Sequence, residues 1–237
     1  MRANDLLANY YNKIYSDLKS SSVNDDEISM INFLVEPRSK VLDVGGGTGR
    51  HAITLAEQSF DVTVVDISKG MLNQLKGKNK KIKAINKDIF KVNLNEKFDL
   101  IILFWNTFNE IALTKAKAKK LVKVLKNLLN VDGKILINID DTRMVDPSNF
   151  NFTIKKSLSG VDYELSWVTY QYFKRTNTSI SKENLKILSK GKQISELTDY
   201  IKQRYWSLEE VKSLAYTCDL EVKELNSQVS KELYLLL

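Results

Sequence analysis

Between residues 40 and 140 the chain alternates short apolar runs with stretches in which apolar residues recur at helical spacing. The short runs are typical of buried strands, and the stretches between them predict helices. Strands and helices that alternate in this way favour a parallel sheet covered by helices on both faces. We therefore predict an α/β fold with a doubly wound, mostly parallel sheet, whose strands include residues 41–44, 61–66, 82–89, 98–107 and 134–139.

The segment before this core predicts two helices. Residues 4–18 carry apolar side chains at helical spacing, and a polar break is expected over residues 20–24. A second amphipathic helix over residues 26–34 ends before Pro37, because the residue that precedes a proline disfavours the helical conformation.

From about Phe152 the hydrophobic pattern changes to a period of two, which predicts a small antiparallel meander after the fifth strand. Ser207 and Glu210 form a capping box, which begins a helix that runs to Cys218. The expected strands of the meander and of a closing hairpin are 163–173, 180–188, 194–205, 220–225 and 232–237.

Residues 41–50, Val-Leu-Asp-Val-Gly-Gly-Gly-Thr-Gly-Arg, form a strand that ends in a glycine cluster and leads into a helix. This is the opening of a nucleotide-binding βαβ unit, where glycines permit a sharp turn and a close approach to a ligand. The spacing is G-x-G-x-G, and Arg50 stands where the dinucleotide fingerprint requires glycine. Asp43 would repel a pyrophosphate. It suits a positively charged ligand such as S-adenosylmethionine, which carries an ammonium and a sulfonium.

Asp66 ends the next predicted strand, 21 residues after Gly45. An acidic residue about 20 residues beyond the glycine loop is placed to accept hydrogen bonds from a ribose diol. Ser68 follows as the expected N-cap of the next helix. The spacing therefore indicates a ribose-containing ligand.

The order of these elements over residues 38–140 resembles that of the class I S-adenosylmethionine-dependent methyltransferases. The glycine loop resembles the first motif of the family, residues 66–72 resemble its D-x-S-x-x-M-L, and residues 98–107 resemble its fourth motif. In the family, the acidic residue after the third strand accepts from the adenine amino group and the next residue supplies a backbone N–H. The resemblance implies S-adenosylmethionine as cofactor and S-adenosylhomocysteine as product, with the cofactor-binding residues Asp43, Gly45, Gly46, Gly47, Asp66, Ile67, Met71, Asp88, Ile89 and Phe104.

The segment Tyr11-Asn12-Lys13-Ile14-Tyr15 resembles the Y-D-x-x-Y opening of small-molecule N-methyltransferases such as the glycine and amino-sugar enzymes, with asparagine replacing aspartate. There the helix covers the cofactor and the second tyrosine touches the reactive methyl, a role that the resemblance gives to Tyr15. The meander followed by Arg204-Tyr205-Trp206-Ser207 is also found in that group. We therefore expect one domain made of a helical lid (1–36), a cofactor-binding core (37–142), a meander insertion (143–206) and a closing helix and hairpin (207–237).

Methyl transfer from a sulfonium is an in-line displacement, so the protein needs chiefly to align the nucleophile. A base is required only where the nucleophile must lose a proton early. His51 would be neutral in the first turn of a helix, although capping or packing is the simpler interpretation of this residue. The catalytic candidates are Tyr15, His51 and Glu110, with Asp140 and Asp141 as further carboxylates and Phe104, Trp105 and Phe108 as aromatic faces.

Composition limits the partners. The chain has 237 residues and a net charge of +7, and its lysines gather over residues 76–83 and 115–126 without interleaved aromatic residues. We interpret them first as solvated surface rather than a nucleic-acid footprint. A single cysteine and a single histidine argue against a disulfide within the chain and against a metal site. With neither a membrane-spanning run nor a signal-peptide pattern, we expect a cytoplasmic protein with no membrane partner.

These observations predict a methyltransferase that acts on a small-molecule acceptor at nitrogen or oxygen, without a choice between the two atoms. An RNA or protein methyltransferase, motivated by the charge, and a catalytically silent methyltransferase-like binding subunit remain as alternatives. A nicotinamide oxidoreductase is opposed by Asp43 and by the glycine spacing. Val168, Tyr170 and Tyr172 make both faces of the meander apolar in places, which predicts a homodimer through this sheet.

Overall fold

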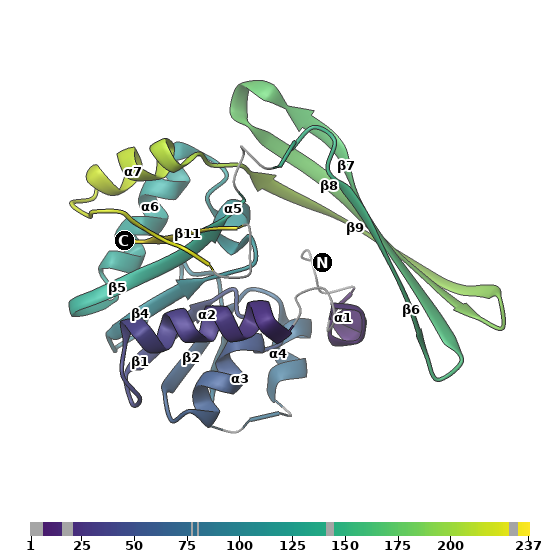
Figure 1. The fold of residues 1–237 in the computed structure, drawn as a ribbon, viewed down its shortest axis with the longest axis horizontal. Helices are drawn as coiled ribbons and strands as arrows, with labels where there is room; N and C mark the ends of the chain where they lie inside the picture. The colour runs from purple at the N-terminus through teal and green to yellow at the C-terminus, as the bar shows by residue number, and fades with distance from the viewer. Residues whose placement is uncertain (1–6, 16–20, 77, 80, 141–144, 228–231) are drawn as a thin grey trace.

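The computed structural model describes residues 7–15, 21–76, 78–79, 81–140, 145–227 and 232–237. Its larger part is built on a seven-stranded sheet in the order β10-β11-β5-β4-β1-β2-β3 (Figure 1). Strands β1 to β5 are parallel, whereas β11 runs antiparallel to both of its neighbours. The strands are β1 (Lys40–Val44), β2 (Asp61–Asp66), β3 (Lys83–Asn86), β4 (Phe98–Leu103), β5 (Leu129–Ile139), β10 (Lys223–Leu225) and β11 (Leu233–Leu236).

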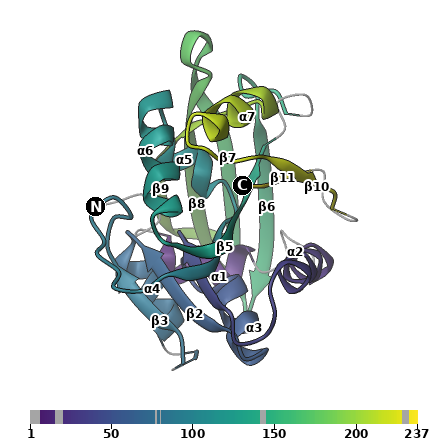
Figure 2. The ribbon, with the colours of Figure 1, turned by 90° about the vertical axis from the view of Figure 1, so that its left-hand side faces the viewer.

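Helices cover both faces of this sheet (Figure 2). On one face α6 and α7 bury Leu121 and Val211, respectively, against the sheet. On the other face α2, α3 and α4 do the same with Ile31, Leu55 and Leu72, respectively. The sheet is therefore enclosed by apolar side chains on both sides, as parallel sheets require. The helices are α1 (Ala8–Tyr15), α2 (Ser21–Leu34), α3 (Arg50–Glu57), α4 (Lys69–Lys76), α5 (Thr107–Ile111), α6 (Lys115–Lys126) and α7 (Leu208–Tyr216).

A second sheet, four-stranded and antiparallel in chain order, stands beside the first (Figure 1). Helix α1 packs against one face of it, where Ile14 and Tyr15 join Leu165 and Leu185 in a separate apolar cluster. The last turn of α1 therefore packs on the second sheet. The strands are β6 (Asn151–Leu158), β7 (Val161–Phe173), β8 (Thr178–Ser189) and β9 (Lys192–Arg204).

The predicted architecture is confirmed: a doubly wound, mostly parallel sheet, helices before it, and an antiparallel sheet after β5. The capping box is also confirmed, since the Ser207 side chain accepts from the Glu210 backbone and the Glu210 carboxylate accepts from the Ser207 backbone. Within the described ranges, no helix is long and apolar enough to cross a bilayer.

The polar break expected over residues 20–24 is wrong for residues 21–24, because α2 already begins at Ser21; Ser20 lies outside the described residues. Asn24 reads as a breaker in isolation, but tertiary contacts hold this part of the chain in the helix. The Asn24 side chain accepts from Arg50 Nε at 3.1 Å, and Asp26 accepts from Ser227 Oγ at 2.6 Å.

The fifth strand begins five residues earlier than expected and contains the turn predicted around Gly133. Asp132 takes a positive φ of 63°, and the pairing of β4 with β5 shifts register near Phe98. A Cβ at Gly133 would lie 2.8 Å from the Phe98 carbonyl oxygen. The glycine therefore permits a bulge inside a continuous strand rather than a turn before it.

Candidate active site

A cavity of about 630 Å³ lies between the core, helix α1 and the inner face of the second sheet. It has two parts, named here by the elements that line them. The loop half is lined by Asp43, Gly45, Gly46, Gly47, Thr48, Arg50, His51, Asp66, Ile67, Ser68, Met71 and Phe104. The sheet half is lined by Tyr15, Trp105, Glu110, Asp140, Phe150, Phe152, Ile154, Trp167, Glu183, Ile201, Gln203 and Tyr205.

The turn after β1 depends on two glycines. Gly45 has a φ of 72°, and a Cβ there would lie 2.6 Å from Thr107 Oγ1. At Gly46 a Cβ would lie 2.4 Å from Asp43 Oδ2. Since a side chain at either position would collide with its neighbour, the glycines let the loop close over the Asp43 carboxylate.

Asp43 is buried at the end of β1, with only 2% of its surface exposed. Its Oδ2 has no hydrogen-bond partner among the described residues. Burial raises the pKa of this carboxyl group to about 6, and His51 opposes the increase. A buried carboxylate oxygen without a partner is costly, and a cationic ligand group would relieve that cost.

Asp66 organises the loop half from the end of β2. Its Oδ2 accepts from the Gly47 backbone at 2.9 Å, and its Oδ1 accepts from the Ser68 backbone at 2.7 Å. The Ser68 hydroxyl in turn accepts from the Met71 backbone at 3.1 Å, as expected for the N-cap of α4. Each carboxylate oxygen keeps further lone pairs, so the same group can also accept from a ligand in the cavity.

His51 is held by a buried acidic residue that the sequence did not single out. Its Nε2 lies 2.8 Å from Glu27 Oε2, and Glu27 Oε1 accepts from the Tyr234 hydroxyl at 2.8 Å. Glu27 is fully buried, and the His51 ring packs 4.8 Å from that of Phe104. One nitrogen of His51 is therefore engaged away from the cavity. The sequence signal that could have identified Glu27 is its position in the predicted helix beside Ile28 and Ile31, on the apolar face.

Two carboxyl groups face the sheet half. Glu183 on β8 is 1% exposed, and its Oε1 accepts a hydrogen bond from the Tyr15 hydroxyl. Burial raises the pKa of Glu183 to about 7, the Tyr15 hydrogen bond lowers it, and Asp199 raises it. Burial raises the pKa of Glu110 to about 8, with further increases from the negative charges of Glu183, Asp66 and Asp199. The sheet half is therefore short of positive charge.

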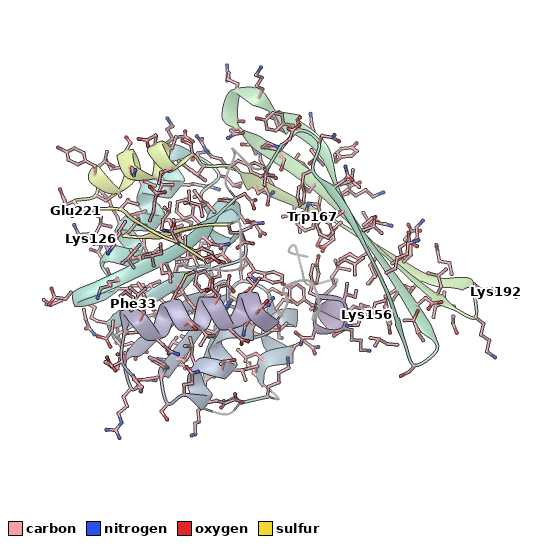
Figure 3. All side chains as sticks on the ribbon, viewed as in Figure 1. Phe33, Lys126, Lys156, Trp167, Lys192 and Glu221 are labelled. Atoms are coloured by element: carbon pink, nitrogen blue, oxygen red, sulfur yellow. The ribbon has the colours of Figure 1, made fainter. Side chains whose placement is uncertain are left out.

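Aromatic rings surround these carboxyl groups. Phe152 and Trp167 are stacked, with ring centroids 6.0 Å apart, and Trp105 meets Tyr15 edge-on at 6.2 Å. Trp167 projects from the face of the second sheet that is turned toward the core (Figure 3). The guanidinium of Arg50 lies 4.5 Å from the Trp105 ring centroid, where the two halves meet. Such faces stabilise a cation by about 0.5–2 kcal/mol each.

Most of the residues predicted from the sequence line this cavity, including Tyr15, His51, Glu110 and nearly all of the cofactor candidates. Asp88 and Ile89 do not. Asp88 Oδ1 accepts from the Phe90 backbone at 3.0 Å, and Ile89 is buried in the core. Phe108 is likewise a core residue that packs on Trp206, so it offers no face to the cavity. Asp141 lies outside the described residues.

The fold and the glycine loop define an α/β enzyme class that binds a nucleoside-containing ligand at the carboxyl ends of parallel strands. Residues 41–133 match the family described as "Methyltransferase domain". A Geobacillus protein named as a methyltransferase is 30% identical over 112 residues, which make up 45% of this chain and 44% of the relative. The glycine/sarcosine N-methyltransferase of Aphanothece halophytica is 30% identical over 105 residues, 42% of this chain and 39% of the relative. The chain thus spans less than half the length of these relatives.

Solved structures share the fold over nearly the whole chain. The CcbJ methyltransferase of Streptomyces caelestis superposes with a TM-score of 0.79 at 17% identity, covering 98% of this chain and 95% of that one. The sugar N-methyltransferase KedS8 of Streptoalloteichus gives 0.78 at 14% identity, with 91% and 86% covered. CalS10 of Micromonospora echinaspora, an amino pentose methyltransferase solved with S-adenosylmethionine bound, gives 0.75 at 15% identity, with 92% and 91% covered. Residues 41–133 therefore match a methyltransferase domain, and nearly the whole chain has the fold of these solved methyltransferases.

We predict that Asp66→Ala weakens the binding of S-adenosylhomocysteine by roughly 2–3 kcal/mol, about 30- to 150-fold, because the ribose loses a charged acceptor. Calorimetry of the purified protein measures the change. Asp61→Ala is the matched control, since Asp61 is exposed at the opposite end of the same strand. An unchanged dissociation constant in a folded Asp66→Ala protein would contradict the role given to Asp66.

We also predict that Glu110→Gln raises the melting temperature at pH 9 and leaves it unchanged at pH 4. The folded protein holds the Glu110 proton up to a pKa of about 8, whereas the unfolded chain loses it near the ordinary value. The free energy of unfolding therefore falls as the pH rises between these values. The melting temperature should change by roughly 2–4 °C for each kcal/mol. The control is Glu209→Gln on the surface of α7, and a gain in the control equal to that in Glu110→Gln would contradict the prediction.

Proposed function

We propose that the protein transfers a methyl group from S-adenosylmethionine to the nitrogen of a small-molecule amine. The observation that carries this proposal is the buried Glu183 carboxylate in the sheet half, enclosed by aromatic rings and left with an oxygen that has no partner among the described residues. A cationic group is the ligand that this environment favours.

The loop half fits the cofactor. Asp43 would accept from the ammonium of the methionine moiety, and Asp66 would accept from the ribose hydroxyls. The bound cofactor supplies a methyl group on a positively charged sulfur. The protein's own contribution is to hold the acceptor nitrogen in line with the sulfur–methyl bond, and alignment of this kind can supply about 7–11 kcal/mol.

Several features favour an amine over a hydroxyl acceptor. An amine enters largely as an ammonium, which the carboxylate of Glu183 would attract. Positive charge then develops on the nitrogen during transfer, and the faces of Tyr15, Trp105 and Trp167 can stabilise it. The printed names of KedS8, CalS10 and the Aphanothece enzyme describe N- or amino-sugar methyltransferases, which supports the same choice.

The enclosed position of the cavity favours a small acceptor over a polymer, since α1 and the second sheet both line it. Most lysines of α6 are exposed on the polar face of that helix, while Leu121 and Leu125 on its other face are buried. This distribution supports the interpretation of the net charge as solvated surface rather than as an RNA footprint.

Paired acceptors that differ only in the nucleophilic atom test the proposal. The pairs are benzylamine and benzyl alcohol, glucosamine and glucose, and glycine and glycolate. Mass spectrometry should detect S-adenosylhomocysteine and a methylated product with an amine member and not with its hydroxyl partner. Methylation of an alcohol, or a methyl label found in added RNA or protein instead, would overturn it. Cofactor binding without turnover on any acceptor would favour the silent binding subunit.

We further propose that two copies of the chain associate through the solvent face of the second sheet. Val168 and Tyr170 are 45% and 66% exposed in the single chain, and the Tyr170 ring meets that of Tyr200 at 5.6 Å. Tyr172, in contrast, donates to Asn177 at 2.8 Å. An apolar patch of this kind favours a two-fold interface.

Sedimentation at micromolar concentration should show a dimer that Tyr170→Glu dissociates, because the substitution would bury a charge in the interface. Tyr216→Glu is the matched control, since Tyr216 is 83% exposed on α7 and lies outside the second sheet. A monomeric wild-type protein would reject the dimer and leave the methyltransferase assignment unaffected.

A further inference from the structure

We infer that Glu183, held in place by Tyr15, binds the ammonium group of the acceptor and takes its proton before methyl transfer. This inference rests on the proposed function and assigns to one side chain the step that makes the nitrogen nucleophilic. An ammonium has no lone pair, so an amine that enters in its charged form must lose a proton inside the cavity.

The position of Glu183 in the sheet is the first support. It lies opposite Trp167 on β7 and opposite Asp199 on β9, so these three side chains share the face that is turned to the cavity. The Tyr15 hydroxyl donates to Oε1 and fixes the carboxylate from the α1 side. Oε2 is buried and has no partner among the described residues. It is the oxygen left for the acceptor.

The other candidates for this step are engaged or protonated. The Nε2 of His51 is paired with Glu27, and both oxygens of Asp66 accept from the backbone of the glycine loop and of α4. The pKa of Glu110, raised to about 8 by burial and by Glu183, keeps that group largely protonated at neutral pH. Burial raises the pKa of Tyr15 above its usual range, so its hydroxyl remains a donor.

The charges around Glu183 set the pH at which it acts. The titratable groups that face it are Glu110 of α5 and Asp199 of β9, which are acidic. The hydroxyl groups of Tyr11 and Tyr15 face it from α1. None of these four groups is a cation. Burial raises the pKa of Glu183 to about 7, while the Tyr15 hydrogen bond lowers it. A base with a pKa near the operating pH is well matched to proton transfer.

The proton moves first and the methyl group second. The acceptor ammonium gives a proton to Oε2 of Glu183, which becomes a neutral carboxylic acid, and the nitrogen recovers its lone pair. A nitrogen–carbon bond then forms to the methyl group while the carbon–sulfur bond breaks, and that electron pair stays on sulfur. The product leaves as a methylated ammonium, and Glu183 returns its proton to solvent.

The first test measures cation binding without turnover. Benzyltrimethylammonium, a permanent cation, is titrated against the protein with S-adenosylhomocysteine present, and the fluorescence of Trp105 and Trp167 reports its binding, since both indoles line the cavity. Affinity should rise with pH as Glu183 ionises near pH 7. Glu183→Gln should weaken it about tenfold at pH 8 and remove the rise near pH 7, leaving only the rise that follows the ionisation of Glu110 near pH 8. Glu164→Gln, on the opposite face of the same sheet, is the control and should behave as wild type.

The second test uses the pH dependence of kcat/KM with the amine that gives the highest turnover in the paired screen. Glu183→Gln should lower kcat/KM about a hundredfold or more at neutral pH. Tyr15→Phe should move the acid limb of the profile to higher pH, because it removes the hydrogen bond that lowers the pKa of Glu183. A merely structural role for Tyr15 would lower the rate without moving the limb. Glu183→Asp should restore part of the activity.

Folding is checked by melting at pH 8, where Glu183→Gln should be at least as stable as wild type, since glutamine replaces a carboxylate that burial disfavours. An acid limb that follows the acceptor's own pKa when the amine is varied would overturn the inference, because the enzyme would then select the neutral amine. Unchanged cation affinity in a folded Glu183→Gln protein would also overturn it. Neither result would affect the proposed function, which fails separately if no amine is methylated.

Discussion

The hydrogen bond from Tyr15 to Glu183 joins the two parts of the molecule at the cavity. It links helix α1, which belongs to the beginning of the chain, to a strand of the second sheet 168 positions later. On the α1 side, Tyr15 packs in the same apolar cluster as Ile14, Leu165 and Leu185. Because this bond places an acidic group inside an aromatic enclosure, both the fit of α1 and the charge of the cavity depend on it.

The core and the loop half could be predicted from the sequence because their signals are local. A strand, a glycine cluster and a helix occur within ten residues, and an acidic residue follows at the expected distance. The carboxyl ends of parallel strands lie at one edge of the sheet. Once the two strands were recognised, Asp43 and Asp66 could therefore be placed close together at that edge. The structure shows why glycine is required in this loop, since a Cβ at Gly46 would collide with Asp43.

The sheet half could not be predicted in the same way. A period-two pattern identifies strands, but it does not tell which face meets the core or which residue of a long strand reaches the cavity. Glu183 looks like an ordinary polar position of β8, and the sequence does not show that α1 packs against the same face of the sheet. Glu27 was missed for a related reason, because its partners His51 and Tyr234 come from α3 and β11.

The two halves therefore follow different physical rules. The loop half uses backbone geometry and short-range hydrogen bonds, which leave little freedom for substitution. The sheet half uses side chains on strands whose backbone pairing does not depend on them, so we expect substitutions of residues such as Phe152 and Trp167 to alter the cavity more than the fold. Acceptor choice can vary in this half while the cofactor site stays fixed. The carboxyl groups of Glu110 and Glu183 oppose folding when ionised, and a bound ammonium would remove that cost. The free energy of unfolding that these carboxylates lower in the empty site should therefore rise again when a cation binds.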